Sequence, residues 1–255
     1  MDQIYIPKNR GGFSAGSYVI IKPLDTEENM GKSVEKPYFY NIKKIEPIKL
    51  NIINELMKII KKTAEFENMI ITGSFLDKGF DFNDIDIILI GKNDSNIKLI
   101  EEKIKEQVGI KPHIIFLDNK ILIKGLSSDP LYQMMLSRYI SKKRLIYKIK
   151  QKINYKILDL HLLKSKVLIE NFDILNGDEK YYLIRNMLAV SLFLENKKIN
   201  NENLEKEINN IFDIKSEKIK QNLLEKNSFL KDYKKYYNKI FNKIMAGIKD
   251  GSEQK

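Results

Sequence analysis

The chain has 255 residues and a mass of 29.9 kDa, enough for one large domain or two small ones with a well-buried core. It contains no cysteine and only two histidines, which excludes disulfide frameworks, cysteine-bound metal centres and thiol nucleophiles and favours a reducing, cytoplasmic environment. The net charge of +11 favours a polyanionic partner, although A/T-rich codons for Ile, Lys and Asn account for part of the lysine excess.

Membrane insertion is not expected. The longest apolar run, residues 85–90, is far shorter than the roughly 18 residues that a membrane-spanning helix needs. Residues 1–10 lack the apolar core of a secretion signal. We therefore expect a cytoplasmic protein with no membrane partner.

Residues 1–45 are expected to form an N-terminal extension that contains strands. Two short apolar runs, Tyr18–Ile21 and Tyr38–Tyr40, are separated by a polar, charged loop, and a Gly/Ser-rich stretch precedes the first. Both runs are predicted to be short strands.

Residues 46–128 alternate between helical and extended patterns. Pro47 opens an amphipathic helix, and a second helix is predicted over 96–107. Strands are predicted over 69–71, 84–90 and 113–117, with a further candidate strand over 120–124. This alternation predicts an α/β sheet over about residues 37–125.

Residues 129–248 are predicted to be a helical domain, because strand patterns disappear after Asp129-Pro130. Helices are predicted over 131–139, 145–169, 179–194, 203–211 and about 215–248. Residues 249–255 are expected to be a disordered tail.

The strongest functional signal joins two neighbouring predicted strands. The first ends in Gly73-Ser74, which supplies a close backbone approach, an oriented N–H and a hydroxyl for a phosphate. The second begins with Asp84 and Asp86, whose two-residue spacing places both carboxylates on one face of a strand. Two such charges require a compensating cation, and their oxygens suit a hard divalent ion. The pair is therefore a candidate metal site.

This combination resembles the signature of the polymerase-β-like nucleotidyltransferase superfamily, and it is most similar to small prokaryotic members related to the minimal nucleotidyltransferases. The resemblance covers roughly residues 47–117. It implies a nucleotidyltransferase core of the α/β (α+β) class with a mixed sheet, followed by the all-helical C-terminal domain. It also implies that Asp84 and Asp86 hold Mg²⁺ or Mn²⁺, while Gly73 and Ser74 hold the phosphates of a nucleoside triphosphate. A hydroxyl of RNA or of a protein would then attack the α-phosphate and release pyrophosphate.

The chain departs from this family at the third carboxylate, which usually lies on the next strand. His113 occupies the matching place, and Asp118 lies an odd number of residues further on. Either residue could take part in catalysis, His113 as a base or ligand and Asp118 by turning into the cleft at the strand end. Alternatively, the fold is a non-catalytic module that binds RNA, nucleotide or a protein partner.

Several basic residues are further candidates. By analogy with the family, Lys78 could contact the triphosphate, and Arg185, on an otherwise apolar helix, could reach a phosphate or form a structural ion pair. A basic run could follow a nucleic-acid backbone or form a solvated helix face. The residues of this run that we single out are Lys142, Lys143, Arg144, Lys148 and Lys152.

Overall fold

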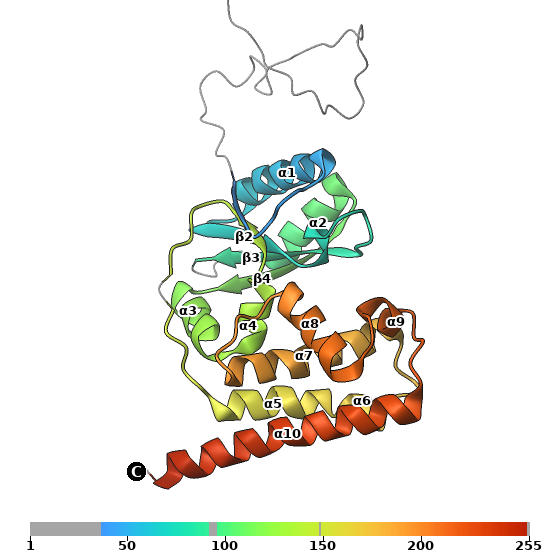
Figure 1. Ribbon diagram of the computed structural model, residues 1–255. Helices are drawn as coiled ribbons and strands as arrows, with labels where there is room; N and C mark the ends of the chain where they lie inside the picture. Colours follow the sequence, from blue (N-terminus) through green and yellow to red (C-terminus); the bar gives the residue numbers. More distant parts are fainter. Residues whose placement is uncertain (1–36, 92–95, 148, 254–255) are drawn as a thin grey trace, which may run out of the picture. The chain divides into compact units, whose positions relative to one another are not determined.

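A computed structural model describes residues 37–91, 96–147 and 149–253 (Figure 1). Residues 37–255 gather into one compact unit that contains a five-stranded sheet and all the described helices. In this part of the chain no helix is both long and apolar enough to cross a membrane. The strand predicted over 18–21 lies outside the described residues.

The sheet is mixed, as predicted. Its order is β1 (Tyr38–Tyr40), β5 (Tyr139–Ser141), β2 (Asn68–Thr72), β3 (Asp84–Ile90) and β4 (Lys111–Leu117). The β3 and β4 strands are parallel and are joined through helix α2 (Ile97–Val108), whereas the other neighbouring pairs are antiparallel. This arrangement confirms the mixed α/β class.

The two faces of the sheet are covered by different helices (Figure 1). Helices α1 (Pro47–Thr63) and α2 pack on the face that carries Ile85 and Ile87. Helix α3 (Asn119–Ser128) packs on the opposite face, against Ile88 and Ile90. Because side chains alternate along a strand, Asp84 and Asp86 lie on the same face as Ile88.

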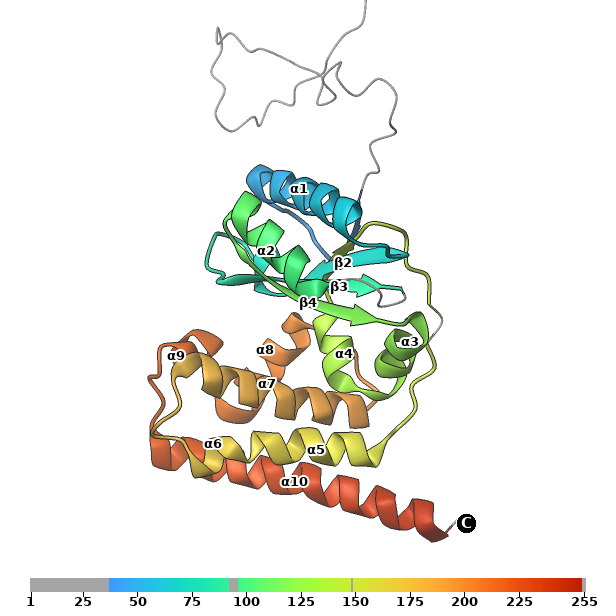
Figure 2. The ribbon, with the colours of Figure 1, turned by 180° about the vertical axis from the view of Figure 1, so that it is seen from behind.

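The remaining helices build a second core around α7 (Gly177–Leu194), as Figure 2 shows from behind. Helix α7 packs against α4 (Pro130–Met135), α5 (Tyr155–Ser165), α6 (Val167–Glu170), α8 (Asn201–Phe212) and α9 (Ser216–Lys220). The long helix α10 (Lys226–Glu253) packs along α5. A capping box between Asn176 and Glu179 fixes the beginning of α7.

Five expectations about elements are wrong. Residues 120–124 belong to helix α3, not to a strand, because Asp118 caps a helix there. The segment 139–141 is strand β5, and no helix or strand forms in the described residues of 142–154. A break at 221–225 separates α9 from α10, and α10 continues to Glu253 where we expected a disordered tail.

A fully buried lysine attaches the loop between β2 and β3 to helix α1. The ammonium group of Lys49 donates to the Asp77 carbonyl at 2.5 Å and lies 3.3 Å from the carboxylate of Glu46. Three phenylalanine rings surround it, with centroids 5.3–5.6 Å away: Phe75, Phe80 and Phe82. Glu46 in turn accepts the Gly79 N–H at 2.7 Å, and this bond is the main reason that the pKa of Glu46 is lowered.

We predict that Lys49→Ala destabilises the protein by roughly 2–4 kcal/mol, because it removes a buried stem and leaves hydrogen-bonding groups without their partner. Lys58→Ala is the matched control on the same helix, since Lys58 is exposed and its pair with Glu55 contributes at most about 0.5 kcal/mol. Urea unfolding of both variants measures the difference. Equal, small losses would show that the Lys49 contacts are not stabilising.

Candidate active site

The β2 strand ends in a turn that only glycine can make. Gly73 has φ 82° and ψ −165°, a conformation essentially restricted to glycine. A Cβ at this position would lie 2.0 Å from Oδ2 of Asp86. Ser74 follows as the exposed first residue of a short 3₁₀ helix over Ser74–Leu76. The turn therefore brings the backbone of Gly73 directly against the acidic pair.

The acidic pair lies at the beginning of β3, as predicted. Asp84 and Asp86 are both partly exposed, whereas Ile85 between them is fully buried on the other face. In the sheet, Asp86 lies between Thr72 of β2 and His113 of β4. Its Oδ1 is 3.1 Å from Nδ1 of His113, while its Oδ2 faces Gly73.

The structure does not bring Asp118 to the acidic pair. Its carboxylate accepts the Lys120 N–H at 2.6 Å and caps helix α3. Asp118 lies five positions after His113 in the sequence, so the two residues are about 16 Å apart along the strand direction. His113, with a mostly exposed side chain, is the residue beside Asp86. The alternative in which Asp118 turns into the cleft is therefore not realised in the structure.

A polar pocket of about 260 Å³ opens beside the Gly73-Ser74 turn. The sheet side contributes Thr72, Gly73 and Ser74, and the helical side contributes residues from α4, α7, α8 and α9. Its lining includes three cationic side chains that are distant in sequence, namely Arg138, Arg185 and Lys220. Asp77 is the one acidic residue among the lining residues. The pocket therefore carries an excess of positive charge next to a phosphate-type turn.

These cations are held in place by neighbouring groups. Arg138 donates to the Asp77 carboxylate at 2.6 Å and reaches the Gly73 carbonyl at 3.5 Å. Arg185 donates to Asn201 at 3.1 Å, and its Nε is buried without a hydrogen-bond partner. The guanidinium of Arg185 and the ammonium of Lys220 both lie over the ring of Tyr181, whose pKa is raised chiefly by burial.

Sequence reasoning did not single out Arg138 or Lys220. A signal for the arginines exists, because the chain has only four, Arg10, Arg138, Arg144 and Arg185, among 45 basic residues. Two of the four line this pocket. The planar guanidinium fork suits phosphate recognition better than a lysine ammonium does. Nothing in the sequence pattern distinguishes Lys220 from the other lysines.

A second groove, of about 610 Å³, lies on the other side of the acidic pair. Asp84 and His113 line it together with charged residues of α2. Asp86 therefore lies between the cationic pocket on the Gly73 side and this groove on the His113 side. Within the described chain, no three Asp, Glu or His side chains gather closely enough to hold a metal ion by themselves.

The other predicted basic residues lie elsewhere. Lys78 is exposed and lines a separate cavity of about 630 Å³ that shares Arg138 with the cationic pocket. Lys142, Lys143, Arg144 and Lys152 lie in the irregular segment before α5, not on a helix face. Lys148 lies outside the described residues. None of the described residues among these lines the pocket beside Ser74.

Comparisons with known proteins give no relative. No protein-family model matches the chain, no curated protein matches its sequence, and no solved structure matches it.

We predict that Gly73→Ala destabilises the protein more than Gly79→Ala, by at least about 1 kcal/mol, because overpacking adds to backbone strain. Both glycines have positive φ, but a Cβ at Gly79 meets nothing within 4 Å, whereas one at Gly73 meets Asp86. Urea unfolding of both variants isolates the steric part. Equal losses would mean that the Gly73–Asp86 contact does not constrain the turn.

Proposed function

We propose that the protein is a Mg²⁺-dependent nucleotidyltransferase that transfers a nucleoside monophosphate from a nucleoside triphosphate to a hydroxyl of RNA or of a protein. One observation carries this proposal: the Gly73 turn touches Asp86 on one side and opens into a cationic pocket on the other. Phosphate-binding groups and divalent-ion ligands are therefore adjacent. The mixed sheet and the order of the turn and the acidic strand support a nucleotidyltransferase core.

The two cavities suggest where each substrate binds. The triphosphate fits the pocket beside Ser74, where backbone N–H groups, a hydroxyl and the guanidinium groups of Arg138 and Arg185 converge. In-line displacement places the attacking hydroxyl opposite the leaving pyrophosphate. The acceptor would therefore approach from the groove lined by Asp84 and His113.

The donor set fits a Mg²⁺ ion that arrives with the nucleotide. Mg²⁺ is usually bound by one or two carboxylates, and substrate phosphates and waters complete its octahedral shell. Asp84 and Asp86 would supply the carboxylates, since they share one face of β3 beside the phosphate turn. The ion supplies charge neutralisation at the phosphates and lowers the pKa of the attacking hydroxyl.

A second candidate is a non-catalytic nucleotide-binding or partner-binding module of the same fold. Two observations favour it: His113 stands where a third carboxylate would complete the site, and Asp118 is used as a helix cap. Imidazole is a poor ligand for Mg²⁺. In this case the wild type binds nucleotide without transferring it, and His113→Asp strengthens Mg²⁺ binding.

We predict that the protein incubated with α-³²P-labelled ATP, CTP, GTP or UTP, Mg²⁺ or Mn²⁺, and total RNA or cell lysate labels an acceptor. Asp86→Asn abolishes labelling but leaves the fold intact, because it relieves repulsion between two like charges. Asp118→Asn is the matched control, since asparagine caps a helix as well as aspartate does. Gel autoradiography and a thermal melt measure both effects.

The outcomes separate the two candidates. Nucleotide binding without labelling in any reaction favours the non-catalytic module. Full activity of Asp86→Asn, or loss of activity in Asp118→Asn with an unchanged melt, contradicts the proposed site.

We also predict that Lys220→Ala weakens Mg²⁺-ATP binding about tenfold or more, because charge-assisted hydrogen bonds contribute about 1.5–3 kcal/mol. Lys218→Ala is the control, as Lys218 lies on the same short helix, is exposed and does not line the pocket. Isothermal titration calorimetry measures both. Equal affinities for the two variants would place the triphosphate outside this pocket.

A further inference from the structure

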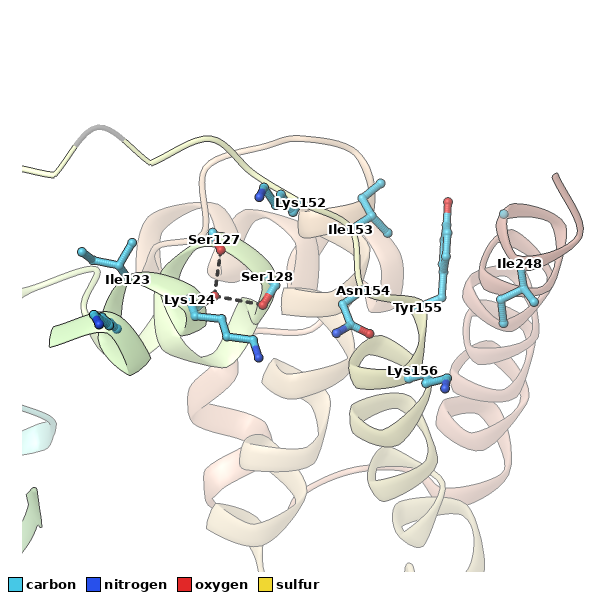
Figure 3. A pocket seen from close by; sticks show the side chains of 12 residues that line it. Ile123, Lys124, Ser127, Ser128, Lys152, Ile153, Asn154, Tyr155, Lys156 and Ile248 are labelled. Atoms are coloured by element: carbon cyan, nitrogen blue, oxygen red, sulfur yellow. Dashed lines mark hydrogen bonds between the residues drawn. The ribbon is translucent and has the colours of Figure 1, made fainter. Parts of the chain in front are cut away.

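A large cavity lies away from the candidate active site. It is an open groove of about 1020 Å³ between α3, the segment that leads into α5, and the C-terminal part of α10 (Figure 3). The Lys152 N–H donates to the Ser127 carbonyl at 2.8 Å, so the segment is attached to α3 along one wall. The groove is therefore built from three parts of the chain that the fold holds together.

All the charged residues that line the groove are positively charged. Four lysines line it, two from α3 and two from the segment around the beginning of α5, namely Lys120, Lys124, Lys152 and Lys156. All four are exposed, and none of them forms an ion pair within the described chain. Among the residues that line the groove, none is acidic. A bound anion would therefore meet no opposing carboxylate on the walls.

Apolar side chains and one aromatic ring also line the groove. Ile123, Ile153 and Ile248 line it, and Figure 3 shows Tyr155 between the last two. A Cβ at Gly247 would lie 2.2 Å from the Tyr155 hydroxyl, so the glycine lets this ring pack closely on α10. The fixed ring and its apolar neighbours offer a surface for a flat, uncharged group such as a base.

The positive charge continues beyond the groove. Lys143, Arg144 and Lys150 are exposed in the irregular segment that enters it. The cations thus line both the groove and the irregular segment that enters it, and a ligand with several negative charges along its length matches them. A phosphate backbone has this property.

We propose that this groove binds the backbone of single-stranded nucleic acid, with phosphates on the lysines of both walls and a base against Tyr155. The inference does not depend on nucleotide transfer, since binding at this groove needs neither Asp86 nor the cationic pocket. The described residues of the basic run form no helix, so the alternative of a solvated helix face does not apply to them.

Binding of a fluorescein-labelled 20-nucleotide oligouridylate, measured by anisotropy between 50 and 300 mM salt, tests the proposal. The triple variant Lys120→Glu, Lys124→Glu, Lys152→Glu is expected to lose at least tenfold in affinity. With about 0.7 counterions released per phosphate contact, loss of three contacts lowers the slope of log Kd against log salt by about 2.

The control triple Lys231→Glu, Lys234→Glu, Lys235→Glu makes the same charge change on exposed residues of α10 that do not line the groove. It is expected to retain most of the affinity, and circular dichroism confirms that both triples are folded. Equal losses in the two triples, or no oligonucleotide binding by the wild type, would overturn the proposal. The proposal would also be overturned if poly-glutamate competed as well as an unlabelled oligonucleotide of equal charge. That result would show that the groove binds any polyanion, including an acidic protein segment.

Discussion

The close approach of Gly73 to the Asp86 carboxylate is the constraint on which the candidate site depends. An added Cβ would lie 2.0 Å from that carboxylate, so the turn after β2 and the acidic beginning of β3 can be this close only with glycine. The loop that joins them is anchored on both sides, by Lys49 at its backbone and by Arg138 at the Asp77 side chain. The same contact separates the cationic pocket from the groove beside His113.

Elements with a strong local pattern could be predicted from the sequence, and those set by distant contacts could not. The apolar runs of β2 and β3 and the helical spacing of α1 and α2 required no knowledge of neighbours. Strand β5 has three residues and exists because it pairs with β1 and β2, far away in sequence. The alternation around Ile121 resembles a strand, but the Asp118 cap begins a helix there.

In the candidate site, too, local sequence patterns could be predicted and contacts between distant residues could not. The shared face of Asp84 and Asp86, and their nearness to Gly73, follow from strand periodicity and the turn residue. The cationic lining could not be predicted, because Arg138, which follows α4, and Lys220 of α9 come together only when α4 and α9 both pack against α7. Asp118 stays out of the cleft for a local reason, because at the end of β4 its carboxylate accepts the backbone N–H of Lys120.

The most direct test of the central claim is a crystal structure with Mg²⁺ and a nucleoside triphosphate analogue whose α–β bridge cannot be cleaved. We expect the triphosphate to lie between Ser74 and Arg185, and the ion to be bound by Asp84 and Asp86. A nucleotide bound away from the Gly73 turn, or an ion that contacts neither aspartate, would contradict it.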